Sequence, residues 1–449
     1  MAHGETAAAP RPTLGLFDAV AMIVGIVIGA GIFRAPSIVA GSVSSDTVFI
    51  ALWIAGGVIS LVGALCYAEL GSSHPNAGGE YHFIHRAYGS SLAFLFAWAR
   101  MTVVQTGAIA AIAFVFADYA SKLLPIGEKS SLIYALLAVV ALTAINIVGT
   151  KESKLVQNLL TAALAFAMGA VIVAGFSHPP HESAAAAAAS TGPAFSQLAL
   201  IFILLTYGGW NEAAYLTAEV RDPRRNIVRA LVIGILTVTV LYVLLNVAYV
   251  RVLGLDGMKA SKALAADLMN ETLGGAGAVV LSLIVIAASL STLNATVFTG
   301  ARTNYAVGRD YAIFRALGRW SNGANAPVNA LLLQGVIAVA LVLLSSMTPD
   351  GFETMVAYTA PAFWLFFMLT GISLFILRRQ APAQANPFRV PLYPFTPALF
   401  CAMCAFMLYS STSYALSKNA SSIGAQLGIG VLLVGIPLML IARVRRAAT

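Results

Sequence analysis

Charged residues are scarce in this sequence. Only 10% of its 449 residues are Asp, Glu, Lys or Arg, whereas 59% are hydrophobic. A soluble protein carries about 25% charged residues to solvate its surface. The composition therefore excludes an ordinary water-soluble fold and indicates that most of the surface contacts lipid. The net charge of +8 does not indicate a nucleic-acid partner, because the basic residues are scattered singly between apolar runs.

Cysteine and histidine are also rare, with three and six residues respectively. Cys401 and Cys404 form an isolated CxxC pair, whereas a zinc site needs about four ligands. The sequence contains neither HExxH nor GxSxG, the patterns of zinc proteases and serine hydrolases. We therefore expect no metal, no cofactor and no enzymatic activity. No basic region precedes an apolar core at the N-terminus, so the first apolar run is expected to remain as a membrane helix.

Long apolar runs, in contrast, fill most of the chain. A helix needs about 20 mainly apolar residues to cross about 30 Å of hydrocarbon. The runs predict an all-α membrane protein with twelve transmembrane helices, over residues 17–40, 48–70, 92–121, 130–149, 155–177, 195–218, 227–253, 275–303, 327–347, 353–377, 394–416 and 422–442.

The positions of Lys and Arg predict the orientation of these helices. If the N-terminus is cytoplasmic, 18 of the 26 Lys and Arg residues lie inside, six lie outside, and Arg34 and Arg100 lie within spans. Cytoplasmic loops carry the excess of positive charge. We therefore expect a multi-pass protein of the bacterial inner (plasma) membrane with both termini in the cytoplasm.

Two predicted spans are interrupted by glycines at matching depths. Gly29 lies 12 residues after Phe17, and Gly208 lies 13 residues after Phe195. Glycine lowers the cost of leaving helical geometry, and unwound backbone at membrane depth is tolerated only where it lines a cavity. Freed N–H groups attract a carboxylate, and freed carbonyls accept hydrogen bonds from an ammonium group. The pair of breaks predicts an inverted-repeat transporter with a site for a zwitterion; the alternative is that these glycines only permit close helix packing.

Several motifs together resemble a known family. They are Gly-Ile-Val-Ile-Gly-Ala-Gly-Ile-Phe at 25–33, Tyr-Ala-Glu-Leu-Gly at 67–71, Gly-Gly-Glu-Tyr at 78–81, Tyr-Gly-Gly-Trp-Asn at 207–211 and Asp-Pro-Arg-Arg-Asn-Ile at 222–227. In these segments the chain is similar to the amino acid–polyamine–organocation superfamily, and in particular to bacterial relatives of the L-type amino acid transporters.

The resemblance implies a fold of the LeuT type, which is a five-plus-five inverted repeat with discontinuous helices one and six. An alanine-rich segment with three prolines at 178–194 would then be a flexible exterior linker between the repeats. The implied organisation is a cytoplasmic tail at 1–16, a first repeat at 17–177, the linker at 178–194, a second repeat at 195–378, and helices eleven and twelve with a short cytoplasmic tail at 379–449.

The resemblance also implies where the substrate binds. Backbone N–H groups around the first break would hold its carboxylate, and backbone carbonyls around the second break would hold its ammonium group. The implied substrate-binding residues are Gly29, Ala30, Gly31, Ile32, Leu205, Thr206, Tyr207, Gly208 and Gly209.

The sequence departs from the family pattern at three places. Leu205 occupies the position of a bulky aromatic gate in several relatives. Leu164 stands where some proton-coupled relatives carry a lysine, which argues against coupling through that group. The loop from Lys122 to Lys129 has no cysteine, so we expect no disulfide-linked heavy chain of the kind that animal L-type relatives use.

Three charged residues lie within predicted spans. An intramembrane charge costs several kcal/mol and usually has a partner or a function. Arg100 and Glu212 both fall in the cytoplasmic half, so we expect them to pair in an inner gate or a proton relay; the alternative is that Arg100 reaches to the interface. Arg34 is expected to have a structural or gating role, in contact with Asp350 or Glu353; the alternative is a contact with an acidic substrate group.

Sodium coupling is a weaker expectation. Ser291 and Thr292 could offer hydroxyls to a sodium ion beside the first break, although such hydroxyls are common at membrane helix interfaces.

These features favour a secondary transporter of amino acids that works by alternating access, as an exchanger or a proton symporter. The alternatives are a transporter of polyamines or other organic cations and, in another class, a non-transporting membrane sensor. The expected partners are the amino acid substrate, membrane lipids and, for a symporter, protons.

Overall fold

The computed structural model describes residues 14–76, 78–148, 154–181, 195–216, 220–321, 323, 325–380, 388–417 and 419–447. This part of the chain is helical, with three isolated β-bridges and no sheet. The elements are α1 (Leu16–Val27), η1 (Ala30–Phe33), α2 (Ala35–Ala40), α3 (Asp46–Ser73), α4 (Gly79–Tyr88), α5 (Ser90–Ala99), η2 (Arg100–Val104), α6 (Gln105–Leu123), α7 (Ser130–Val148), α8 (Lys154–Ser177), α9 (Gln197–Thr206), η3 (Trp210–Glu212), α10 (Ala213–Leu216), α11 (Pro223–Ala260), α12 (Leu264–Asp310), η4 (Ala312–Phe314), α13 (Val328–Ser345), α14 (Gly351–Gln380), α15 (Phe395–Ala415) and α16 (Ser422–Ala447).

The predicted all-α class agrees with this architecture. Each of the twelve predicted segments coincides with one helix, or with helical pieces that follow one another directly. Within the described residues, nine helical stretches are long and apolar enough to cross a membrane. The segments outside this set are α8 and the two interrupted spans, whose helical pieces are short.

Both predicted helix breaks are present. α1 ends at Val27, and Gly29 is extended, with φ −97° and ψ 173°, before the 3-10 turn η1 begins. α9 ends at Thr206, and Gly209 adopts φ 105° before the 3-10 turn η3. The chain therefore leaves helical geometry at the two places where glycines interrupt the apolar pattern.

Other features of the helices were not predicted. The amphipathic helix α4 lies between the second and third predicted spans. Span three contains a π-helical turn, η2, that begins at Arg100. α11 and α12 continue beyond the predicted spans, but each changes direction at a glycine with positive φ, Gly254 and Gly274 respectively. The 182–194 part of the predicted linker lies outside the described residues.

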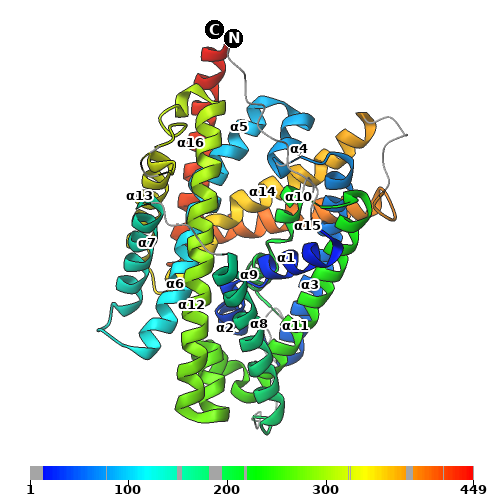
Figure 1. The fold of residues 1–449 in the computed structure, drawn as a ribbon. Helices are drawn as coiled ribbons and strands as arrows, with labels where there is room; N and C mark the ends of the chain where they lie inside the picture. The colour runs from blue at the N-terminus through cyan, green and yellow to red at the C-terminus, as the bar shows by residue number, and fades with distance from the viewer. Residues whose placement is uncertain are drawn as a thin grey trace.

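The interrupted helices occupy the middle of the bundle. Figure 1 shows α1, α2 and α9 between the long helix α12 and the pair formed by α3 and α11. α6 packs against α12 and α14, and α14 packs against α15 and α16. The bundle has two ends: the α2 end carries the loops before α7 and α14, and the α4 end carries α4 and the start of α5.

Close helix contacts hold the frame around the breaks. A Cβ on Gly57 of α3 would lie 2.4 Å from the side chain of Thr239 on α11, and one on Gly107 of α6 would lie 2.3 Å from Thr359 on α14. These distances are far below van der Waals contact, so the helices approach as closely as only glycine permits.

Candidate functional site

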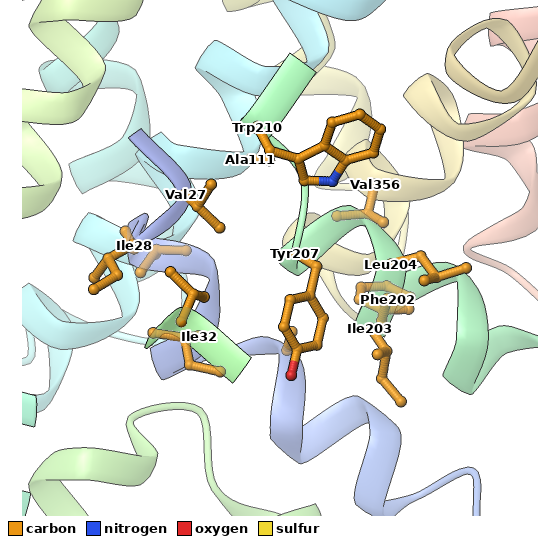
Figure 2. Packing of buried hydrophobic residues seen from close by; sticks show 14 of the residues in the cluster. Val27, Ile28, Ile32, Ala111, Phe202, Ile203, Leu204, Tyr207, Trp210 and Val356 are labelled. Carbon is orange, nitrogen blue, oxygen red and sulfur yellow. The ribbon is translucent and has the colours of Figure 1, made fainter. Parts of the chain in front are cut away.

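The two helix breaks face each other. A Cβ on Gly31 would lie 4.0 Å from Oγ1 of Thr206, and one on Gly209 would lie 3.1 Å from the carbonyl oxygen of Ile26. Figure 2 shows Val27, Ile28 and Ile32 at the first break and Tyr207 and Trp210 at the second. The structure thus brings together the two groups of residues that the sequence singled out separately.

The first break offers backbone N–H groups. The N–H of Gly29 is used by the carbonyl of Val27, at 2.7 Å. In a 3-10 helix each N–H donates to the carbonyl three residues earlier. The third residue therefore reaches the carbonyl of the residue before the helix, whereas the N–H groups of the first two residues have no partner inside it. In η1 these first two residues are Ala30 and Gly31, so their N–H groups are the ones left for a ligand, whereas Ile32 stands at the third position.

The second break offers backbone carbonyls. The carbonyl of Leu205 accepts the N–H of Gly208 at 3.1 Å. The hydroxyl of Thr206 donates to the carbonyl of Phe202 within α9, at 2.6 Å, so it is engaged in the helix. The carbonyl of Thr206, at the end of α9, and that of Gly208, within the break, lie beyond the last regular helical pairing and are the better candidates for an ammonium group.

A tyrosine that the sequence did not single out connects the two breaks. The hydroxyl of Tyr242 on α11 lies 2.8 Å from the carbonyl of Val27 and 3.4 Å from the carbonyl of Thr206, the last residues of α1 and α9. Its ring packs against Tyr207 and Trp53, with centroids at 5.1 Å and 6.1 Å. One buried side chain therefore contacts the ends of both interrupted helices, α1 and α9.

At the α2 end, Arg34 binds two carboxylates. Its Nε donates to Asp118 of α6 at 3.1 Å, and its Nη2 donates to Asp350, which precedes α14. The contact with Asp350 agrees with one of the sequence-based expectations, whereas Asp118 was missed. Glu353, the other expected partner, accepts hydrogen bonds from Tyr414 at 2.6 Å and Asn419 at 3.4 Å instead. The Arg34 side chain is only 3% exposed.

At the α4 end, Arg100 also lies between two acids. Its Nη2 is 3.2 Å from Glu212, the expected partner, and its Nη1 is 3.6 Å from Glu80 of α4. Glu80 is buried, with 5% of its side chain exposed, and accepts a hydrogen bond from Tyr67 at 2.6 Å. Glu212 is 37% exposed. The π-helical turn that starts at Arg100 is the kind of helix irregularity found at functional sites.

Aromatic rings pack against the second break on the side of the α4 end. Trp210 of η3 contacts Tyr67, Phe367 and Phe400, with centroids 5.1 Å, 5.5 Å and 6.3 Å away. A Cβ on Gly63 would lie 2.6 Å from the Trp210 ring. This cluster fills the space between the breaks and the α4 end.

The remaining coupling candidates lie within regular helices, away from the helix ends. Leu164 on α8 is buried. The hydroxyl of Thr292 on α12 donates to the carbonyl of Ala288 at 3.0 Å, and Ser291 is half-buried on the same helix. Within the described residues, no three His, Cys, Asp or Glu side chains are placed to hold a metal ion.

Comparison with known proteins shows the family of this chain. The profile of the family described as "Amino acid permease" matches residues 14–434. The chain is 31% identical to b(0,+)-type amino acid transporter 1 of Mus musculus over 404 residues, which cover 88% of this chain and 81% of the relative.

Two further relatives cover still more of the chain. It is 28% identical to the serine/threonine exchanger SteT of Bacillus subtilis (strain 168), over 98% of both chains. It is 29% identical to large neutral amino acids transporter small subunit 2 of Homo sapiens, over 97% of this chain and 81% of that protein. The chain belongs to the amino acid permease family, whose members are multi-pass membrane transporters of amino acids and not enzymes.

Proposed function

We propose that the chain exchanges amino acids across the bacterial inner membrane by alternating access. In this proposal its twelve spans form the five-plus-five inverted repeat of the LeuT type, with repeats at 17–177 and 195–378 and helices eleven and twelve at 379–449. Both termini are cytoplasmic, so the α2 end faces the exterior and the α4 end faces the cytoplasm. The excess of Lys and Arg in the loops of the α4 end supports this orientation.

The observation that carries the proposal is the pair of opposed helix breaks. N–H groups of Ala30 and Gly31 hold the substrate carboxylate, and carbonyls of Thr206 and Gly208 hold its ammonium group. Two complementary backbone sites recognise the part that all amino acids share, and the side chain is left to the surrounding spans.

The charged groups at the two ends act as gates in this proposal. Arg34 with Asp118 and Asp350 closes the exterior side, and Arg100 with Glu80 and Glu212 closes the cytoplasmic side. Leu164 stands at the position of the lysine through which some relatives couple to protons. The absence of a lysine there favours exchange over proton symport. The pairing of Glu212 with Arg100 leaves it less suited to bind a polyamine.

Uptake into proteoliposomes tests the proposal. A panel of radiolabelled amino acids is offered with and without internal amino acid, and with an imposed proton gradient. Uptake that needs internal amino acid and ignores the gradient is expected. Uptake driven by the gradient alone would replace exchange with proton symport, and an absence of uptake for every amino acid would overturn the proposal in favour of organic cations.

Replacement of Tyr242 by Phe is expected to lower the exchange rate. The change removes only the hydroxyl that bonds Val27 and Thr206, and one hydrogen bond contributes about 0.5–1.5 kcal/mol, or about twofold to tenfold in rate. Tyr249→Phe on the same helix is the matched control, because its buried hydroxyl has no hydrogen-bond partner among the described residues. Equal rates for the two variants would show that Tyr242 does not position the breaks.

A further inference from the structure

A hollow lies at the α2 end, beside the ion pairs of Arg34. Its volume is about 160 Å³, and Asp118 and Asp350 are among the residues that line it. For comparison, a cavity of about 150 Å³ can hold a benzene molecule. The hollow is therefore large enough for a small amino acid. None of the residues of the two breaks lines it.

The hollow presents both signs of charge. Its carboxylates are Asp118, Glu128 and Asp350, and its ammonium groups are Lys129 and Lys262. Neither lysine forms an ion pair within the part of the chain that the structure describes, although Lys262 is near enough to Asp118 for their charges to interact. Carboxylates and ammonium groups around one hollow are complementary to a zwitterion.

The two carboxylates nearest Arg34 depend on it. One oxygen of Asp118 accepts the hydroxyl of Ser131 at 2.7 Å, and one oxygen of Asp350 accepts the N–H of Glu353 at 2.9 Å. The other oxygen of each is bonded to Arg34. The Asp118 side chain is 7% exposed. If Arg34 moves away, each carboxylate loses a charged partner in a poorly solvated place, which is unfavourable unless another cation replaces the guanidinium.

We propose that the hollow is an entry site for a zwitterionic amino acid, whose ammonium group replaces Arg34 on Asp118 and Asp350 while Lys262 and Lys129 bind its carboxylate. The inference deepens the proposed transport function and rests on it. An amino acid at the entry site compensates the two carboxylates, so the path to the first break opens. Without an amino acid the path stays closed, which suppresses opening of the empty protein to the exterior and favours exchange.

Protection from alkylation tests the entry site. Ser346 lines the hollow and is exposed, so the Ser346→Cys variant reports on access when cells are treated with a membrane-impermeant maleimide. Alanine and leucine are added as probes, each beside its N-acetyl derivative, which lacks the ammonium group. The chain without Ser346→Cys gives the background from its natural cysteines.

The variant Gly31→Leu separates the entry site from the central site. Its side chain fills the space between the breaks, so transport is expected to be lost. Protection by the free amino acids, but not by the N-acetyl derivatives, is expected to remain. Protection that disappears in this variant, with labelling in the absence of amino acid unchanged, would overturn the entry site, as would equal protection by the N-acetyl derivatives. Failure of the transport proposal would be seen separately, as absence of uptake by the parent chain.

A surface variant keeps the test informative if Gly31→Leu does not fold. Lys262→Gln removes an exposed lysine and is expected to raise the amino acid concentration for half-protection by up to about fivefold, the upper effect of one exposed ionic contact. Asp256→Asn, an exposed carboxylate at the same end that does not line the hollow, should leave that concentration unchanged. An unchanged concentration in Lys262→Gln would contradict the assignment of the substrate carboxylate.

Discussion

Gly209→Ala is expected to lower the maximal exchange rate by about tenfold or more. Gly209 has φ 105°, a conformation in which a side chain costs about 1–2 kcal/mol, and about 1.4 kcal/mol corresponds to a tenfold change in rate. The new Cβ would also lie 3.1 Å from the carbonyl oxygen of Ile26. Because Gly209 belongs to the second break and Ile26 to the last turn of α1, the backbone cannot yield without moving the second break relative to the end of α1.

The control for this variant is another glycine-to-alanine change. Gly430→Ala on α16 adds a Cβ that meets no atom within 4 Å, so its exchange rate should equal that of the parent chain. Size-exclusion profiles of the solubilised proteins show whether each variant is folded. A folded Gly209→Ala protein with the parent rate would mean that the geometry of the second break does not limit transport.

Arg100→Leu is expected to reduce both exchange and thermal stability strongly. The variant removes the Arg100 guanidinium from beside the buried carboxylate of Glu80, and breaking a buried ion pair in this way costs about 3–5 kcal/mol. The rate should therefore fall by about two to four orders of magnitude if the loss falls on a transport intermediate. Glu212, with 37% of its side chain exposed, is solvated and should contribute much less.

A comparison of double variants distinguishes the two acids. Glu80→Gln removes the buried negative charge next to position 100 and should restore part of the activity and stability lost in Arg100→Leu. Glu212→Gln should restore little, although Glu212 lies closer to Arg100, because burial rather than distance sets the penalty. Strictly additive effects for both acids would show that Arg100 is coupled to neither, and the cytoplasmic gate would have to be abandoned.

The fold was predictable where it depends on apolar runs and glycines. Runs of about 20 apolar residues are constrained by the thickness of the bilayer, so helix positions followed from the sequence, and the breaks followed from the glycine clusters. α4 was missed because a ten-residue amphipathic helix has too little apolar sequence to distinguish it from a loop. The extension of α11 after Gly254 and that of α12 before Gly274 were missed because their composition is that of connecting segments.

The site was predictable only in part, because ion pairs depend on how distant helices are placed. Arg100 and Glu212 could be matched by depth alone. Asp118 could not be assigned to Arg34, since 84 residues separate them and the pairing depends on the position of α6. Tyr242 gave no signal, because a tyrosine within an apolar run is more often a packing residue than a bridge between two helix ends.

Competition for exchange tests the central claim, that the opposed breaks bind the two charged ends of one amino acid. Unlabelled analogues that lack only the ammonium group or only the carboxylate are added, at equal concentration, to the amino acid that exchanges fastest. The account predicts that the intact amino acid competes and that neither analogue does, because each leaves one break without its ligand. Full competition by the amine without the carboxylate would contradict the account and indicate a transporter of organic cations.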